Sequence, residues 1–242
     1  MATPSASPSL EGRVLAIAGA GGNLGPTVVR RLAPVAGRLC LCGRDRSSLE
    51  PLAAESPETI DTDALDLLDA AATKAWADEL VERHAGVDAL VHLVGGWRGG
   101  MPIEESPRED WDLLHDLLVG TLQTTTQAFA RPLMESGRGR FVIVSTGQAQ
   151  APTHKNAAYA AAKAAAESWT LALADRFKGT GATANIVVVG AIVAPGMREE
   201  SPDKDFSAFT PAEEIAEAIA YLCSDAASSM NGQRLTLRGA AA

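Results

Sequence analysis

The chain has 242 residues, of which 46% are apolar, and both values suit one large globular α/β domain with a sizeable core. Its 30 acidic and 21 basic residues give a formal net charge of −9, which argues against nucleic acid or an anionic membrane surface as the main partner. The longest apolar run, from Ile186 to Pro195, is too short for a membrane span, which takes about 20 residues.

The first residues, Met1 to Glu11, are rich in Pro, Ser and Ala and lack the basic start and apolar run of a secretory signal. We therefore expect a short disordered tail over residues 1–11 and one folded domain over residues 12–242. The three cysteines form no Cys-x-x-Cys pair, so we interpret them as small buried hydrophobic residues and expect no metal site. This cysteine usage fits a reducing cytoplasm.

Short apolar runs alternate with stretches of helical periodicity along the whole chain. Nearly continuous Val, Ile and Leu in the short runs indicate strands that are buried on both faces. The sequence therefore predicts an α/β fold, a doubly wound parallel sheet of about seven strands with helices on both faces, as in Rossmann domains. In chain order the predicted elements are strand Val14–Gly19, helix Leu24–Leu32, strand Arg38–Cys42, helix Ser47–Glu55, strand Thr59–Leu65, helix Leu68–His84, strand Ala89–Val94, helix Trp111–Met134, strand Arg140–Thr146, helix Asn156–Phe177, strand Ala184–Val189, helix Pro211–Ser224 and strand Arg234–Leu237.

A glycine-rich turn follows the first predicted strand. It runs from Gly19 to Gly25 with the sequence Gly-Ala-Gly-Gly-Asn-Leu-Gly and leads directly into a helix. Glycines let the chain turn tightly and let a pyrophosphate approach the main chain, while the helix N-terminus offers free N–H groups and a partial positive charge. The turn therefore predicts a dinucleotide site at the start of the fold.

Tyr159 and Lys163 lie four residues apart in a predicted helix, so both side chains share one helix face. A nearby ammonium stabilises phenolate and lowers the pKa of a phenol from about 10 toward neutral pH. We expect this phenol to give a proton to a carbonyl oxygen or to take one from an alcohol.

Together these motifs make the chain similar to the short-chain dehydrogenase/reductase superfamily, over about residues 11 to 240. The turn resembles the family's Gly-x-x-x-Gly-x-Gly, with Gly19 and Gly25 at the first and third glycines and Asn23 at the middle one. Asparagine tolerates a left-handed backbone, so we expect Asn23 to preserve the turn. The resemblance implies a nicotinamide cofactor, Tyr159 as acid and base, Lys163 on the nicotinamide ribose, and a homodimer or homotetramer packed through the two long helices.

The end of the second predicted strand predicts which cofactor is bound. NAD-dependent members of the family carry an acid there, whereas this chain has Gly43 followed by Arg44. A guanidinium can bind a 2′-phosphate through charge-assisted hydrogen bonds, so we expect NADP(H). The residues expected to bind it are Gly19, Gly22, Asn23, Leu24, Gly25, Arg44, Asp66, Leu67, Gly95, Tyr159, Lys163, Gly190 and Ile192.

The family's catalytic serine precedes the tyrosine by thirteen residues, which places Thr146 there with Ser145 beside it, and either hydroxyl could polarise a carbonyl. Other positions depart from the family pattern. Leu118 replaces an asparagine of the central helix, Ala194 replaces a threonine that holds the nicotinamide amide, and His92 replaces the first asparagine at the end of the fourth strand.

The resulting hypothesis is an NADP(H)-dependent oxidoreductase that transfers hydride between nicotinamide and a small carbonyl or alcohol substrate. Because of the departures, the alternative is a nucleotide-binding protein with little or no redox turnover, acting as a sensor or in assembly. We expect a segment from Met197 to Phe209 to close over the substrate as a mobile lid. The residues expected to contact the substrate are Trp97, Gln148, His154 and Met197.

Overall fold

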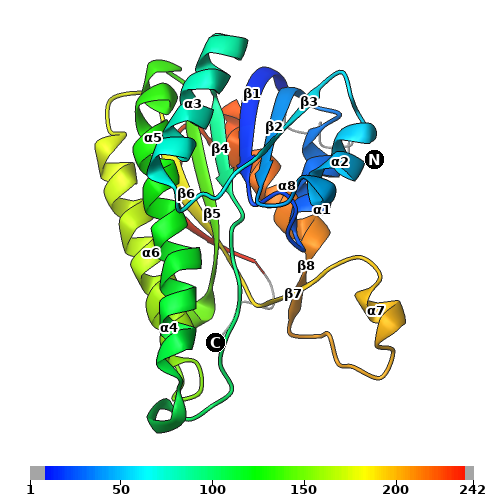
Figure 1. The fold of residues 1–242 in the computed structure, drawn as a ribbon, viewed down its shortest axis with the longest axis vertical. Helices are drawn as coiled ribbons and strands as arrows, with labels where there is room; N and C mark the ends of the chain where they lie inside the picture. Colours follow the sequence, from blue (N-terminus) through cyan, green and yellow to red (C-terminus); the bar gives the residue numbers. More distant parts are fainter. Residues whose placement is uncertain (1–8, 238–242) are drawn as a thin grey trace, which may run out of the picture.

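Seven apolar segments form one parallel sheet in the computed structural model, which describes residues 9–237 (Figure 1). The strand order is β3-β2-β1-β4-β5-β6-β9, so the direction of winding reverses between β1 and β4. This arrangement confirms the predicted doubly wound α/β fold. The strands are β1 Leu10–Ala18, β2 Ala36–Gly43, β3 Ile60–Ala64, β4 Ala89–His92, β5 Arg140–Thr146, β6 Thr183–Val189 and β9 Arg234–Thr236.

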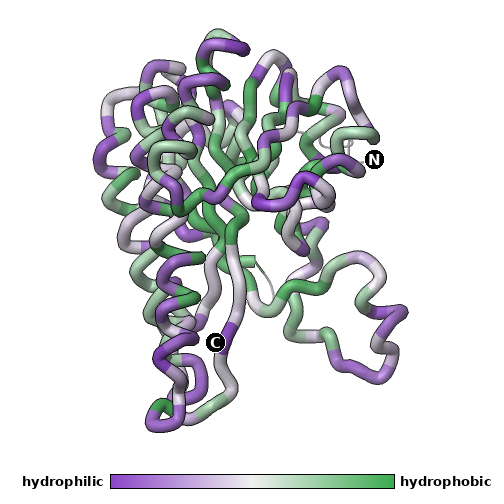
Figure 2. The backbone as a smooth tube through the Cα atoms, in the orientation of Figure 1, coloured by the Kyte–Doolittle hydropathy of each residue, from purple (hydrophilic) through white to green (hydrophobic). Residues whose placement is uncertain are grey.

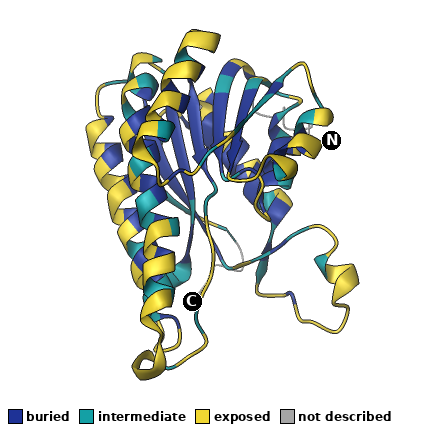
Figure 3. Cartoon of the chain, viewed as in Figure 1, coloured by how far each residue is buried: buried dark blue, intermediate teal, exposed yellow. Residues whose placement is uncertain are grey.

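Helices cover both faces of the sheet because successive strand residues point to opposite sides. In β1, Leu15 and Ile17 join the core under one helical layer, and Ala16 and Ala18 join the core under the other. Figure 2 shows apolar strands between polar helix surfaces, and Figure 3 shows the same strands buried. The first layer contains α1 Gly25–Leu32, α2 Arg46–Ala54 and α8 Ala212–Cys223, and the second contains α3 Ala70–His84, α4 Arg108–His115, α5 Thr121–Glu135 and α6 Ala157–Arg176.

The predicted long helix Trp111–Met134 is interrupted. Helices α4 and α5 are joined by a π-helical turn, Asp116–Gly120, in which the backbone is wider than in an α-helix. The Thr121 hydroxyl donates to the Leu117 carbonyl over 2.7 Å and helps to satisfy this turn. Leu118 lies inside the turn and is buried against Leu114 and Ala162.

The predicted disordered tail is wrong at its end. Strand β1 begins at Leu10, which is fully buried and pairs with Ala36 of β2. The strand starts this early because Leu10 is buried in the core. The sequence did not predict this start, since Glu11, Gly12 and Arg13 interrupt the apolar pattern. Residues 1–8 of the predicted tail lie outside the described residues.

A segment not predicted as regular structure follows β6. Strands β7 (Ala191–Val193) and β8 (Phe209–Pro211) form a separate two-stranded parallel sheet, and the chain between them carries the short helix α7 (Met197–Glu200). This excursion projects away from the main sheet (Figure 1). Three 3-10 turns complete the described chain, at Ile103–Glu105, Gly147–Ala149 and Asp225–Ala227.

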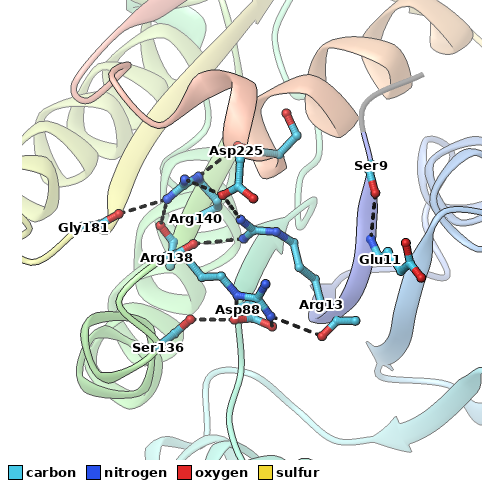
Figure 4. A network of polar contacts seen from close by, with 12 residues as sticks. Ser9, Glu11, Arg13, Asp88, Ser136, Arg138, Arg140, Gly181 and Asp225 are labelled. Carbon is cyan, nitrogen blue, oxygen red and sulfur yellow. Dashed lines mark hydrogen bonds and ion pairs between the residues drawn. The ribbon is translucent and has the colours of Figure 1, made fainter. Parts of the chain in front are cut away.

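A charge network with two buried arginines joins the amino ends of the strands (Figure 4). Arg13 of β1 and Arg140 of β5 are both almost fully buried and both face Asp225. Asp88, just before β4, accepts from Arg138 Nε over 2.9 Å and from the Ser136 hydroxyl over 2.6 Å. These contacts tie one edge of the sheet together and leave the opposite edge, at the carboxyl ends of the strands, for ligands. Within residues 9–237, no helix combines the length and apolar character needed to cross a membrane.

Candidate active site

One cavity of about 880 Å³ runs along the carboxyl edge of the sheet. The glycine-rich turn and Arg44 line one end, and Tyr159, Lys163 and Thr146 line the other. The reversal of winding between β1 and β4 creates this crevice, which is where doubly wound folds bind ligands. A volume of this size is within the range of cofactor sites, which extends to about 1,000 Å³.

Two glycines of the turn are required by close contacts. Gly19 has φ +82°, and a Cβ there would lie 2.7 Å from Val94 N. A Cβ on Gly25 would lie 1.8 Å from the Ala20 carbonyl oxygen, so this glycine lets α1 pack against the turn. Gly25 is also the single predicted cofactor residue that does not line the cavity, because it is buried behind the turn.

Asn23 lines the cavity, and the turn does not make use of its tolerance for a left-handed backbone. Within residues 9–237, Ala85 is the one non-glycine residue with positive φ. The turn therefore places its left-handed residue at Gly19 and leaves the position of Asn23 open to any side chain that fits.

The start of α1 fits a phosphate group. Its N-cap, Leu24, makes no side-chain hydrogen bond to the helix, and the first turn contains no acidic residue. Gly25 N already donates to the Gly22 carbonyl over 3.1 Å and Pro26 has no N–H, so Thr27 N is the first-turn donor left for an anion, which the helix dipole also favours. The turn residues and this helix start together suit a dinucleotide pyrophosphate.

The end of β2 presents an exposed arginine beside an acid. Arg44 is exposed and lines the cavity. The neighbouring Asp45 caps α2 by accepting from Ser47 N over 3.1 Å, so its carboxylate already has a partner. Ser48 lines the cavity as well, and the sequence reasoning missed it, although its place just after an Asp helix cap was a usable signal.

Tyr159 and Lys163 share a face of α6, as the spacing predicts. Lys163 is buried and donates to the Val144 carbonyl over 2.8 Å. Burial lowers the pKa of Lys163 to about 8, with the Glu167 carboxylate acting in the opposite direction. Burial also raises the pKa of Tyr159 to about 12. The expected lowering of the phenol pKa by the lysine is therefore absent, and desolvation of the ring is the cause of the opposite shift.

The two candidate hydroxyls have different partners. Ser145 donates to Glu167 Oε1 over 2.5 Å, and Arg234 holds the same carboxylate with its Nε 2.8 Å from Oε2. Thr146 Oγ1 instead accepts from Gln148 N over 3.4 Å, which leaves its own O–H hydrogen for another acceptor. Both residues line the cavity.

His92 is a cavity residue whose role the sequence reasoning missed. Its Nε2 lies 3.3 Å from the Thr121 hydroxyl and its Nδ1 lies 3.2 Å from the Thr125 hydroxyl. Burial, and secondarily the charge of Lys163, lower the pKa of His92 to about 3, so the ring is neutral at physiological pH. A histidine replacing the family's asparagine at a strand end was the available signal.

Of the predicted substrate residues, Trp97 and Gln148 line the cavity. His154 lines a neighbouring apolar groove of about 420 Å³ instead. Met197 lines neither hollow, because α7 projects outward, and its sulfur accepts from Ala194 N over 3.2 Å.

The cysteines are buried, as predicted, and burial raises the pKa of each thiol to about 12. Cys40 lies near Asp61 and His84, with one ligand-type atom of each within 4.8 Å of the others. Asp61 is paired within this group, with its carboxylate 2.8 Å from His84 Nε2 and 3.3 Å from Arg38 Nη1. None of these three residues lines the cavity, so we assign the group no part in hydride or proton transfer.

Comparison with known proteins places this geometry in a family. A family model described as enoyl-(acyl carrier protein) reductase matches residues 19–239. Gluconate 5-dehydrogenase of Gluconobacter oxydans is 29% identical over 251 residues, covering 96% of this chain and 95% of the relative. The 3-oxoacyl-acyl-carrier-protein reductase of Thermotoga maritima is 27% identical over 244 residues, covering 95% and 98%.

Among solved structures, a gluconate 5-dehydrogenase from Burkholderia cenocepacia in complex with NADP and tartrate superimposes with a TM-score of 0.85 and 25% identity, covering 96% of this chain and 95% of the other. The family match spans nearly the whole chain, and the fold and the Tyr159–Lys163 pair agree with it. The chain belongs to the short-chain dehydrogenase/reductase superfamily of oxidoreductases.

Proposed function

We propose that the protein is an NADP(H)-dependent oxidoreductase that reduces an aldehyde or ketone, or oxidises the corresponding alcohol. The observation that supports this most strongly is the single cavity that joins the glycine-rich turn at one end to the Tyr159–Lys163 pair at the other. A cofactor lying along this cavity would have its phosphates at α1 and its nicotinamide beside Tyr159.

The choice of NADP(H) rests on Arg44. Its exposed guanidinium lines the nucleotide end, and Asp45 beside it is engaged as the cap of α2. The NADP named for the Burkholderia cenocepacia structure fits this choice. Ser48 lines the same end of the cavity, and its hydroxyl would have to turn away from the Asp45 carbonyl, to which it donates over 2.7 Å, to reach this phosphate.

The bound dinucleotide would supply or accept the hydride. We assign Thr146 as the hydroxyl that polarises the substrate carbonyl, because Ser145 already donates to Glu167 while Thr146 keeps its O–H free. Tyr159 gives the carbonyl oxygen its proton, and the charge of Lys163 stabilises the phenolate that remains.

The protonation state of Tyr159 in the free site is the one that carbonyl reduction requires. Burial raises the pKa of Tyr159 to about 12, so the phenol holds its proton at neutral pH and is ready to donate it. The reverse reaction would require that proton to leave first. We further propose a cytoplasmic location and a homodimer or homotetramer, in keeping with the family.

The test is steady-state oxidation of NADPH with a panel of ketones and diketones, using wild type and Tyr159→Phe. The variant keeps the ring and its packing but lacks the proton, so turnover should be lost while NADPH binding persists. Binding is measured separately, since NADPH at 100 times its Kd should add about 2.7 kcal/mol to the free energy of unfolding. NADPH binding with no turnover of any carbonyl would instead favour the non-redox alternative.

A further inference from the structure

Two amide side chains meet beside the cavity, and one backbone group fixes the orientation of both. Thr153 N donates to Asn156 Oδ1 over 2.7 Å. A backbone N–H can only donate, so the oxygen of Asn156 must face Thr153 and its Nδ2 must face the other way. Asn156 Nδ2 in turn donates to Gln148 Oε1 over 2.7 Å.

This chain of contacts leaves Gln148 as a donor. Gln148 lines the cavity and is half-buried, and its one acceptor atom is already used by Asn156. For its Nε2, the described part of the chain offers no hydrogen-bond partner. The oxygen of the amide is therefore turned toward Asn156, and its N–H groups are left for whatever lies in the cavity.

Gln148 is next to the proposed reaction centre in the chain, and it lines the same cavity as Thr146 and Tyr159. The backbone nitrogen of Gln148 is 3.4 Å from Thr146 Oγ1, the hydroxyl assigned to the reacting carbonyl. A substrate held by Thr146 and Tyr159 would thus place its neighbouring atoms within reach of the Gln148 side chain.

The same end of the cavity has one cationic side chain, Lys163, and the proposed function assigns it to Tyr159 and the nicotinamide ribose. The charged residues of the lining are Arg44, Asp45 and Asp66 at the nucleotide end, and Lys163, whose ammonium is bonded to the Val144 carbonyl. Trp97 and Leu117 contribute apolar surface to the lining. An uncharged substrate fits this lining better than a carboxylate does.

We infer that Gln148, held by Asn156, donates a hydrogen bond to a second acceptor oxygen of an uncharged substrate, beside the carbonyl that is reduced. The substrate class is then a vicinal diketone or an α-hydroxyketone, and neither a simple ketone nor a 2-oxo acid. This inference rests on the proposed function. Gln148 determines specificity by contact, and Asn156 is a positioning residue that acts through it.

The test uses one matched series of six-carbon substrates: 3,4-hexanedione, 4-hydroxy-3-hexanone, 3-hexanone and 2-oxohexanoate. For each substrate, kcat/KM with NADPH is measured for wild type and variant, so that intrinsic reactivity cancels in the ratio. NADPH affinity and Tm of each variant serve as controls for folding.

Gln148→Met has similar length but no donor. We expect its kcat/KM to fall roughly three- to tenfold for the dione and for the hydroxyketone, the effect of one lost hydrogen bond, with 3-hexanone unchanged. An equal fall for all three, or no fall for the dione, would overturn the role of Gln148.

Asn156→Asp tests the positioning. A carboxylate keeps the bond from Thr153 N but can only accept, so Gln148 must turn and present its oxygen to the cavity. The dione, which has only acceptors, should then lose activity, while the hydroxyketone, which has an O–H, should keep it. An unchanged dione-to-hydroxyketone ratio would show that Asn156 has no such role, since a structural defect alone would lower both.

Wild-type preference for 2-oxohexanoate would overturn the uncharged substrate class. If wild type oxidises NADPH with none of the ketones, the proposed function fails and this inference fails with it. If all the ketones are reduced but the variants show no discrimination, this inference alone fails.

Discussion

At the residue scale, Arg44 is the side chain on which the cofactor assignment depends. Arg44→Ala should weaken NADPH binding by about 1.5–3 kcal/mol, the range for a hydrogen bond to a charged group, and barely affect NADH. Calorimetric titration of both nucleotides measures the difference. Arg46→Ala, a nearby exposed position at the start of α2, is the matched control. Equal losses for NADPH and NADH would contradict the assignment.

Glu167 accepts hydrogen bonds from Ser145 and Arg234, and its charge also acts on Lys163. Its carboxylate opposes the effect of burial on Lys163, whose pKa is about 8. Because the charged ammonium stabilises phenolate on Tyr159, the reduction rate should be full at lower pH and decline as pH rises through about 8. Glu167→Gln keeps an acceptor for Ser145 but removes the charge, so the pKa of Lys163 should fall further and the decline should move to lower pH. Profiles of kcat against pH that coincide for the two proteins would refute this.

At the element scale, the segment from Met197 to Phe209 is a compact excursion whose two ends lie together, an arrangement that allows it to move as one unit. The strands β7 and β8 pin its two ends together. Phe206 is buried and packs on Phe209 with ring centroids 5.0 Å apart, and Lys204 lies over both rings. We expect the segment to close over bound substrate as a preformed body.

Hydrogen exchange measures this closure. Amide protection in the excursion should increase when NADPH and a substrate analogue are added, and the strands of the main sheet serve as the internal control. Slow exchange in the free protein that does not change with ligand would show that the segment is a static wall.

Comparison of the predicted and observed elements shows what the sequence could and could not predict. Strands and helices followed from periodicity, and the glycine-rich turn followed from its glycine spacing, although the contact that requires Gly19, with Val94 N, joins residues far apart in the chain. The π-helical turn at Asp116–Gly120 was not predictable, because the leucine stripe fits a continuous helix equally well. The partner of Ser145 was hidden for another reason, since Glu167 comes twenty-two residues later in the chain. A hydrogen bond between residues this far apart cannot be inferred from the sequence of either segment alone.

At the scale of the whole molecule, the outer face of α6 is suited to a second copy of the chain. Ala161, Ala165 and Trp169 recur every fourth residue and are exposed, and the small alanines permit close helix approach. Light scattering at micromolar concentration should report a dimer or tetramer for the wild-type protein.

Ala165→Glu should dissociate the assembly, because it places a charge where two helices would meet. The equivalent change Ala75→Glu, at an exposed position of α3, should leave the assembly intact. A wild-type monomer would contradict the expected oligomer, and an Ala165→Glu protein that remains assembled would place the interface elsewhere.

The three buried cysteines have a practical consequence for the intact protein. A thiol reagent attacks the thiolate, and burial with pKa values of about 12 leaves Cys40, Cys42 and Cys223 protonated and out of reach. With Ellman's reagent, we expect no rapid labelling of the native protein and simultaneous labelling of all three in denaturant; fast reaction of one thiol in the native state would contradict this. The rate of slow labelling in buffer then reports how often the native structure opens, so the native cysteines are an intrinsic probe of unfolding. A cysteine introduced at the surface can also be labelled with a dye without removing the native ones.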